Sequence, residues 1–304
     1  MDQGMKKSSH VLRQIACELL SKEAGDRMEP ISELSQRLHA SAGTVQNAIR
    51  TLEREGVIGI LVRGHLGSFL SYLDYDRLLT YAGISSVFCA MPIPYSVRYK
   101  GLASGIRQQL STLGLEKTGM FFISGSQCRI NALLEERVDG VVLSGLSARH
   151  YLESGLPVEI LHKFPAGSYI NNHYLITRKG FDLEHCASVR VGVDNSSHDQ
   201  QMWNRICFAG LNVQEVPVHY LHVLEHIKSG YIDATVWSFE DSYPDPALSA
   251  VELHAPGMEE NTAAVLLARR DDVGMRGFLK RNIDFDQISR TQRAVMDGSI
   301  LPDY

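Results

Sequence analysis

The sequence predicts an α/β protein in which a small amino-terminal helical unit precedes two α/β lobes. Three observations support this prediction. Residues 30–70 read as a helix, a turn, a second helix and a hairpin. From residue 83 onward, apolar strand segments alternate with helical segments. A second series of the same kind begins at residue 189. Such alternation predicts parallel sheets with helices on both faces.

The composition indicates a folded chain of two or three compact units. The chain has 304 residues, of which 44% are hydrophobic and 21% charged. Its net charge of −5 argues against nucleic-acid binding along its whole length. Residues 1–71 hold nine Lys/Arg and eight Asp/Glu, a net charge of +1, while the remainder carries −6. Any DNA affinity therefore depends on the placement of individual arginines, doubled by dimerisation.

Cysteine usage and hydropathy predict a cytoplasmic protein with no membrane partner. No run of about 18 apolar residues is present, and Arg13 and Glu18 interrupt the first apolar stretch, which argues against a signal peptide. The cysteines are odd in number and form no C-x-x-C pair, so we expect free thiols rather than a disulfide or zinc framework. They are Cys17, Cys89, Cys128, Cys186 and Cys207.

The two helices of residues 30–56 begin and end at recognisable signals. Pro30 suits the opening turn of the first helix, because its missing N–H costs nothing there. Ser41 stands where its hydroxyl can cap the second helix, and Gly56 stands where a left-handed glycine ends one. The second helix has an apolar face and an opposite polar face. The apolar residues are Val45, Ala48, Ile49 and Leu52, and the polar ones are Gln46, Asn47, Arg50 and Arg54.

The polar face has the side chains that a major-groove helix needs. Asn and Gln bond adenine bidentately, and Arg bonds guanine or a phosphate. The start of the helix can hold a phosphate, and the hairpin tip can touch the DNA backbone or the minor groove. The alternative is an ordinary helical hairpin with a solvated face. The candidate DNA-binding residues are Ser41, Thr44, Gln46, Asn47, Arg50, Arg63 and His65.

These motifs resemble the winged helix-turn-helix of GntR-type transcription regulators. The resemblance rests on Ser41-x-x-Thr44-Val45, on Leu52-Glu53-x-Glu55-Gly56, and on Arg63-Gly64 through Gly67-Ser68-Phe69. It implies a DNA-binding unit with a recognition helix and a wing. Gly43 and Gln46 stand where those regulators often place arginines, so the operator sequence is expected to differ.

Domain limits follow from these changes of pattern. We expect a winged helix-turn-helix over residues 1–72, a linker over 73–82 and a two-lobed domain over 83–304. The linker segment is equally compatible with a simple connection and with a dimer contact. Lobe 1 is expected at about 83–172 and 245–304, and lobe 2 at about 173–244.

The strands and helices of the two lobes are predicted from their apolar runs and periodicity. The expected strands are 84–90, 119–124, 139–145, 158–161, 174–177, 189–193, 213–218, 232–237 and 263–268. The expected helices are 99–113, 126–137, 148–153, 200–208, 221–229, 272–281 and 286–296.

Ligand-binding residues are expected at the carboxyl ends of the strands, where open α/β sheets hold their ligands. Asn195, Ser196 and Ser197 follow a strand and precede a helix, whose free N–H groups favour an anion such as a carboxylate or phosphate. Helix capping alone is the alternative for these residues. Further candidates from other strand ends are Tyr95, Ser96, Ser124, Ser126, Ser144 and Trp237, with Phe239, Glu240 and Asp241 beyond them.

Two α/β series with a late strand returning to the first resemble the two-lobed type II periplasmic-binding-protein fold. The phrase from Gly230 to Ala234, a helix end followed by Asp and a small residue, carries this likeness. Together with the winged helix, the whole chain resembles the YhfZ family of bacterial regulators. That resemblance implies a GntR-like DNA-binding domain joined to an effector-binding domain, with a double-stranded DNA operator and a small-molecule effector as partners.

Catalytic and metal-binding patterns are weak. His219 and His222 are three residues apart, and His222 and His226 are four apart. Neither pair forms the H-E-x-x-H motif, and no third metal ligand is evident for them. No G-x-S-x-G and no glycine-rich phosphate motif occurs. We therefore expect no cofactor, no metal and no enzyme, but a homodimeric transcription regulator that responds to a small, anionic metabolite. A small-molecule enzyme on the same fold and a transport receptor are the alternatives.

Overall fold

The computed structural model describes residues 2–219, 222–238, 245–254 and 257–304. The chain forms two compact units, which we describe separately. The amino-terminal unit consists of Met1–Val87, Leu115–Lys117 and Arg270–Ile283. The carboxy-terminal unit consists of Phe88–Gly114, Thr118–Arg269 and Asp284–Tyr304. The expected domain limits stay a prediction. Among the described residues, no helix has both the length and the apolar character that crossing a membrane requires.

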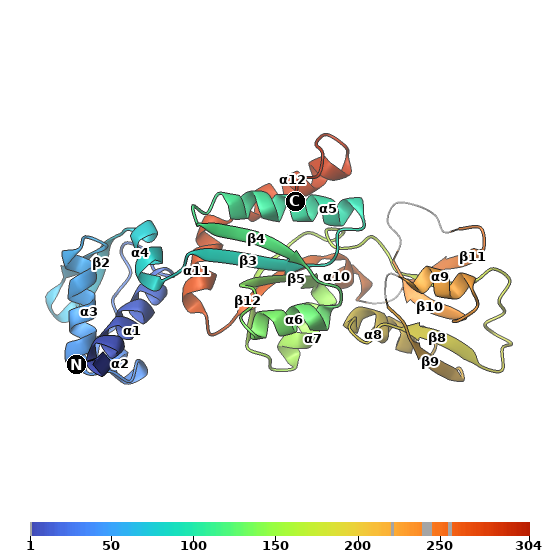
Figure 1. Ribbon diagram of the computed structural model, residues 1–304, viewed down its shortest axis with the longest axis horizontal. Coiled ribbons are helices and arrows are strands. Elements are labelled where there is room, and N and C mark those ends of the chain that lie inside the picture. The colour runs from blue at the N-terminus through green and yellow to red at the C-terminus, as the bar shows by residue number, and fades with distance from the viewer. Residues whose placement is uncertain (1, 220–221, 239–244, 255–256) are drawn as a thin grey trace. The chain divides into compact units, whose positions relative to one another are not determined.

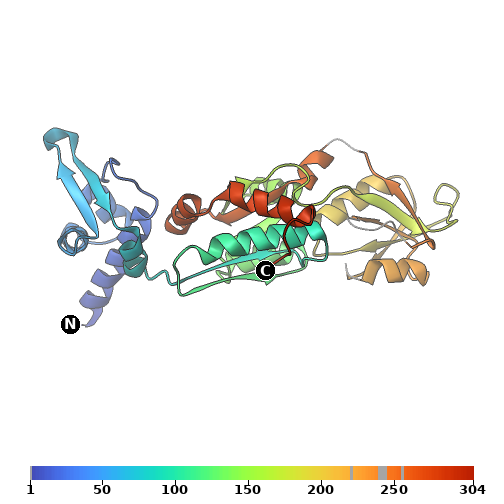
Figure 2. The same cartoon turned by 90° about the horizontal axis from the view of Figure 1, so that it is seen from above.

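The amino-terminal unit contains the predicted helices and hairpin. The strands of the hairpin pair antiparallel, with Ile58 opposite Leu73 and Val62 opposite Ser68. The hairpin projects beyond the helices of the unit (Figure 2). In chain order the elements are α1 (Asp2–Leu19), α2 (Ile31–Arg37), α3 (Ala42–Arg54), β1 (Ile58–Val62), β2 (Ser68–Leu73) and α4 (Tyr75–Ala82).

Local signals set the ends of α3 as predicted. Ser41 Oγ accepts a hydrogen bond from the Thr44 amide at 3.2 Å, which satisfies one of the helix's unpaired N–H groups. Gly56, just past the helix, has a φ of +69°, a conformation that L side chains rarely adopt. The predicted apolar face of α3 is buried. Helix α1 precedes α2 and α3 and spans Asp2–Leu19.

The segment expected as a linker is a packed helix. Asp74 caps α4 through a hydrogen bond from the Arg77 amide at 3.1 Å. Leu78, Leu79 and Ala82 are buried, and α4 packs against α1. The hairpin is therefore followed by a helix that belongs to the core of the amino-terminal unit.

Helix α11 (Val273–Asn282) joins the amino-terminal unit although it comes late in the chain. It packs closely against α1: a Cβ added at Gly274 would lie 2.3 Å from the Cys17 carbonyl oxygen. A Cβ at Gly277 would lie 2.4 Å from Cα of Ser21. Arg281 donates to the Lys22 carbonyl at 2.9 Å. The sequence predicted this helix, but not its packing partner.

The carboxy-terminal unit has two five-stranded sheets. The first has the order β4-β3-β5-β12-β6, and helices cover both of its faces, with α5 and α12 on one side and α6 and α7 on the other (Figure 1). Its strands are β3 (Ser86–Met91), β4 (Lys117–Phe122), β5 (Gly140–Ser144), β6 (Val158–Lys163) and β12 (Ala264–Arg269). Its helices are α5 (Val97–Ser111), α6 (Ser126–Leu134), α7 (Gly145–Glu153) and α12 (Phe285–Met296).

The second sheet has the order β11-β7-β10-β8-β9. Strand β11 and helix α10 were not predicted, because each consists of only five residues and shows too little periodicity to identify it. The strands are β7 (Tyr174–Arg178), β8 (Val189–Val193), β9 (Val213–Pro217), β10 (Ala234–Trp237) and β11 (Leu248–Glu252). The helices that follow or flank them are α8 (His198–Cys207), α9 (Val223–Lys228) and α10 (Met258–Thr262).

The prediction of purely parallel sheets is wrong. Strands β3 and β5 are parallel, as are β8, β9 and β10. Strand β12, however, runs antiparallel to both β5 and β6, and β7 runs antiparallel to β10 and β11. The reason is that β7 and β12 do not return through a crossover helix as a βαβ unit requires, but enter their sheets from the segments that connect the two sheets.

Helices α5 and α12 approach each other closely because α5 has glycines at two facing positions. A Cβ at Gly101 would lie 2.8 Å from the Gln292 carbonyl oxygen, and one at Gly105 2.8 Å from that of Ile288. The Gln292 amide donates to the carbonyls of Arg98 and Ser168, at 3.1 and 2.7 Å. These contacts fix the start of α5, and α5 begins beside the cavity described next.

Candidate functional site

The outward face of α3 is polar and accessible. Gln46, Asn47 and Arg50 are exposed, and Arg50 forms no ion pair with any described residue. Ser41 and Thr44 lie at the start of the helix, where their hydroxyl oxygens are 2.8 Å apart. The structure thus places five of the seven candidate DNA-binding residues along one helix, with their side chains on its solvent-facing side or at its start.

The two remaining candidates lie at the tip of the hairpin. His65 belongs to a short 3₁₀ turn of residues Gly64–Leu66, and both Arg63 and His65 are exposed. The Arg63 guanidinium lies 5.1 Å from the centre of the Phe69 ring, which steadies it through a cation–π contact. Arg37, in contrast, pairs with Glu18 and Glu29, so its charge is balanced within the fold.

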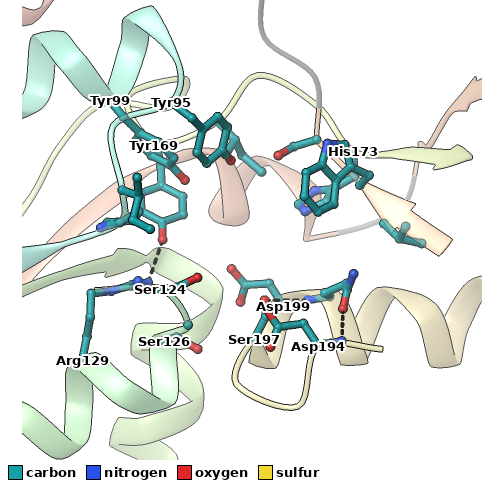
Figure 3. A pocket seen from close by; sticks show the side chains of 18 residues that line it. Tyr95, Tyr99, Ser124, Ser126, Arg129, Tyr169, His173, Asp194, Ser197 and Asp199 are labelled. Atoms are coloured by element: carbon teal, nitrogen blue, oxygen red, sulfur yellow. Dashed lines mark hydrogen bonds between the residues drawn. The ribbon is translucent and has the colours of Figure 1, made fainter. Parts of the chain in front are cut away.

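The carboxy-terminal unit holds a cavity of about 80 Å³, which has room for several water-sized groups and hence for a small ligand. Figure 3 shows Tyr95, Tyr99 and Tyr169 on one side of it, and Asp194, Ser197 and Asp199 on the other. The rings of Tyr95 and Tyr99 meet edge to face, as do those of Tyr99 and Tyr169. The candidates among the lining residues are Tyr95, Ser124, Ser126, Ser197 and Trp237.

Two of the predicted ligand-binding serines act as helix caps instead. Ser96 is 1% exposed, and its hydroxyl accepts from the Tyr99 amide at 3.1 Å at the start of α5. Ser144 is fully buried and accepts from the Ser147 amide at 3.0 Å at the start of α7. Neither lines the cavity. A serine between a strand and the following helix can either cap the helix or bind a ligand, so the sequence pattern does not distinguish the two roles.

Asn195 and Ser196 line a more open hollow, which shares Ser124 and Asp194 with the cavity and also includes Cys128 and His219. Ser196 Oγ and the Ser196 amide both donate to Asp194 Oδ1, at 2.6 and 2.9 Å. The loop is close to Gly125, where an added Cβ would lie 2.1 Å from Ser196 Oγ. Phe239, Glu240 and Asp241 lie outside the described residues.

The sequence analysis missed several residues of the cavity. Arg129 projects from α6, and its guanidinium donates to the carbonyls of Val142 and Ile123 and to the Tyr169 hydroxyl, at 3.0, 2.7 and 3.1 Å. Asp194 directly follows β8, and the sequence analysis chose the three residues after it instead. The others lie in a connecting segment or inside a helix, where no sequence signal marked them. The missed lining residues include Tyr99, Arg129, Tyr169, His173, Asp194, Asp199 and Gln200.

A buried polar network stands behind the cavity. Asp199 Oδ1 accepts from Ser147 Oγ at 2.6 Å. With its amide oriented so that all four neighbours are satisfied, Asn261 donates to Asp199 Oδ2 at 2.9 Å and accepts from His173 Nδ1 at 3.1 Å. Burial raises the pKa of Asp199 and lowers the pKa of His173 to about 4. His173 is therefore neutral near pH 7.

The cavity lacks the arrangement of a common catalytic or metal site. Among the described residues, no three His, Cys, Asp or Glu side chains converge as metal ligands do. Asp199 and His173 are joined only through Asn261, and the nearby hydroxyl of Ser147 is fully buried. The geometry fits binding of a small molecule through hydroxyl, carboxylate and aromatic groups.

Comparison with known proteins connects both units to one family. The model of the YhfZ C-terminal domain matches residues 74–304, and that of a helix-turn-helix domain matches residues 23–70. YhfZ of Escherichia coli (strain K12) is 35% identical over 304 residues, covering 99% of this chain and 98% of that protein.

Solved structures agree with this relationship. The crystal structure of YhfZ from Shigella flexneri superposes with a TM-score of 0.62 at 32% identity, covering 75% of this chain and 97% of that one. The periplasmic aliphatic sulphonate binding protein SsuA from Escherichia coli gives a TM-score of 0.50 at 12% identity, covering 71% and 75%. The latter likeness concerns the fold alone. The chain belongs to the YhfZ family and combines a helix-turn-helix domain with a periplasmic-binding-protein-like α/β domain.

Proposed function

We propose that this protein is a transcription regulator whose binding to a double-stranded DNA operator depends on a small-molecule effector held in the cavity of the carboxy-terminal unit. The observation that carries the proposal is that one chain contains both a helix-turn-helix with an exposed polar recognition face and a binding-protein-like domain with a polar, aromatic cavity. A ligand-responsive regulator needs both the DNA-binding unit and the ligand-binding domain. An enzyme or a transport receptor has no need of the helix-turn-helix.

The DNA contacts follow from the face of α3. Gln46, Asn47 and Arg50 contact base edges in the major groove, and Ser41 and Thr44 hold a phosphate at the start of the helix. Arg63 and His65 contact the adjacent backbone or minor groove. A homodimer places two such helices on the two halves of an operator. Two half-sites also supply the affinity that this weakly charged unit lacks alone.

The chain offers a continuous route from the cavity to the helix-turn-helix. Tyr95 and Tyr99 line the cavity at the start of α5, and α5 packs against α12 through Gly101 and Gly105. Helix α12 follows directly on α11, which packs against α1 of the amino-terminal unit. A ligand that favours one state of the carboxy-terminal unit would act on DNA binding through this connection, by as much as its affinity differs between the two states.

Selection of bound sequences from a random duplex pool tests this proposal. Full-length protein is used alone and with a library of small metabolites. We expect an enriched sequence with two-fold symmetry, whose enrichment changes with at least one metabolite. Absence of any enriched sequence, with and without metabolites, contradicts the proposal. Mass spectrometry of the effective metabolite after incubation separates binding from turnover, since an enzyme converts it.

A further inference from the structure

The described residues that line the cavity include more carboxyl groups than cationic side chains, although burial raises the pKa of one of the carboxyl groups, Asp199. They include the two carboxylates Asp194 and Asp199 and a single cationic side chain, Arg129. His173 is neutral near pH 7, since burial lowers its pKa to about 4. Tyr169 is also neutral, because burial raises its pKa to about 12. The charge that a ligand meets in the cavity therefore depends on which protein groups already pair with Arg129, Asp199 and Asp194.

Arg129 is occupied by the protein itself. It is 3% exposed, and its three nitrogen atoms each donate to a protein acceptor. Two of these acceptors are main-chain carbonyls, that of Ile123 just past β4 and that of Val142 within β5, so the guanidinium ties this sheet to α6. Arg129 is therefore a structural cation whose donors are directed at the protein, rather than a clamp aimed at a ligand.

Asp199 is also satisfied. Its two oxygens accept from Ser147 Oγ and from the Asn261 amide, at 2.6 and 2.9 Å. Ser147 lies in the first turn of α7, where the helix dipole stabilises negative charge. Asp199 thus holds α7 and α8 together and leaves little of its charge for a ligand.

Asp194 is the carboxylate with a spare oxygen. It is 7% exposed and lines the cavity. Its Oδ1 accepts both the amide and the hydroxyl of Ser196. No described residue donates to Oδ2. A carboxylate oxygen at the wall of a cavity is open to a hydrogen-bond donor from a ligand or from solvent.

Two of the N–H groups that favoured an anion in the sequence analysis are already used. The His198 amide donates to Ser126 Oγ at 3.3 Å, and the Gln200 amide donates to Ser197 Oγ at 3.4 Å. The start of α8 is thus paired with serine hydroxyls. An anionic ligand would meet the Asp194 carboxylate without a cation directed at it.

The aromatic side of the cavity favours a ligand with a positive charge. Tyr95, Tyr99 and Tyr169 form a row of edge-to-face rings across from Asp194, and Trp237 also lines the cavity (Figure 3). Aromatic rings attract organic cations, and a carboxylate across from them supplies the counter-charge. A neutral alcohol can donate a hydrogen bond to the carboxylate, but it carries no charge to pair with Asp194 or to interact with the rings.

We infer that the effector of this protein carries a protonated amine, which pairs with Asp194 while its carbon body packs against Tyr95, Tyr99 and Trp237. This inference rests on the proposed function, because it takes the cavity as the effector site. It replaces the anionic effector expected from the sequence with a cationic one, and it makes Asp194 the residue that selects ligand charge.

Matched pairs of probes that share a carbon body test the charge preference. Phenethylamine is compared with hydrocinnamate, and butylamine with butyrate, by calorimetric titration of the full-length protein. We expect the amine of at least one pair to bind on the order of tenfold tighter than its carboxylate, the scale of one charge-assisted hydrogen bond. Equal binding, a preference for the carboxylates, or no binding by any of the four overturns the inference.

Variants locate the preference. Asp194→Asn keeps the oxygen that accepts from Ser196 but removes the charge, and we expect it to lose the preference for the amine. Glu184→Gln removes one exposed carboxylate from the same unit and should bind as the wild type does. Unchanged amine affinity in a folded Asp194→Asn protein overturns the role of Asp194.

A second pair of variants covers the case in which Asp194→Asn does not fold. Tyr95→Leu removes a ring that is 39% exposed, and Tyr95→Phe keeps it. We expect the amine to bind more weakly to the Leu variant than to the Phe variant, whereas equal affinities contradict the aromatic contact. Operator selection is scored separately. Protein that selects DNA but shows no amine preference keeps the proposed function and loses this inference.

Discussion

The imidazole rings of His150 and His198 stack with their centroids 3.7 Å apart and their planes inclined by 12°. His150 belongs to α7 and His198 begins α8, so the stack joins the helices that Asp199 also connects. Burial is the main reason that the pKa of His198 falls to about 4, and the neighbouring His150 and Arg205 add to the effect. Two stacked rings cannot both carry charge without strong repulsion.

We predict that the protein loses stability as the pH falls below about 6.5, the unfolded pKa of histidine. Between that value and about 4 the unfolded chain binds protons at His198 and His173, while the folded chain does not. Stability therefore rises with pH in this window. The thermal midpoint of His198→Asn should depend less on pH there than that of wild type. His10→Asn, at an exposed position, serves as the control. An identical pH profile for His198→Asn and wild type contradicts this.

Gly274→Ala should destabilise the amino-terminal unit by about 1–3 kcal/mol, the usual cost of overpacking. The added methyl would lie 2.3 Å from the Cys17 carbonyl oxygen, and a backbone atom cannot turn aside as a side chain can. Urea denaturation measures the change.

Gly43→Ala is the matched control, because Gly43 lies in α3 with only Ser41 Oγ, at 3.9 Å, near the new methyl. Alanine favours a helix there by roughly 0.5–1 kcal/mol, so the control should gain stability. A Gly274→Ala protein as stable as wild type would mean that α11 does not pack tightly against α1.

Arg50→Ala should weaken binding to the selected operator by about 1–3 kcal/mol, the value of one base or phosphate contact. The reason is that Arg50 is exposed on the polar face of α3 and has no ion-pair partner among the described residues. A gel-shift titration at fixed salt measures the loss. Arg293→Ala removes an equal charge from an exposed site on α12 and should bind the operator as wild type does. Equal weakening in both variants would point to net charge rather than to a contact by α3.

Gly125→Ala should cost about 2–4 kcal/mol, because two effects add. Gly125 has a φ of +77°, which costs alanine about 1 kcal/mol. The methyl would also overlap Ser196, at 2.1 Å from Oγ and 2.8 Å from the carbonyl oxygen, which adds about 1–3 kcal/mol. Gly210→Ala has a similar φ of +86° with nothing within 4 Å of the new methyl, so it isolates the first effect. Equal denaturation midpoints for the two variants would exclude the overlap.

The cavity shows how far strand ends can be read from a sequence. Ser124 and Ser197 were both expected to bind a ligand because each comes after a predicted strand, and both line the cavity. Tyr169 and His173 lie in the segment that crosses from β6 to β7, and their position depends on where that segment runs. Asp194 also follows a strand. Its carboxylate could be considered as a ligand-binding group only after the hydrogen-bond partners of Asp194 and Arg129 were known.

The sequence alone determined the features that depend on neighbours in the chain: the cap at Ser41, the left-handed turn at Gly56, the polar face of α3 and most strands and helices. These follow from hydrogen bonds and periodicities that span a few residues. Tertiary structure alone decided the antiparallel entry of β12, the packing of α11 on α1, and which residues of distant segments line the cavity. Those depend on contacts between residues far apart in the chain, where burial and pairing, rather than local pattern, set the energy of each group.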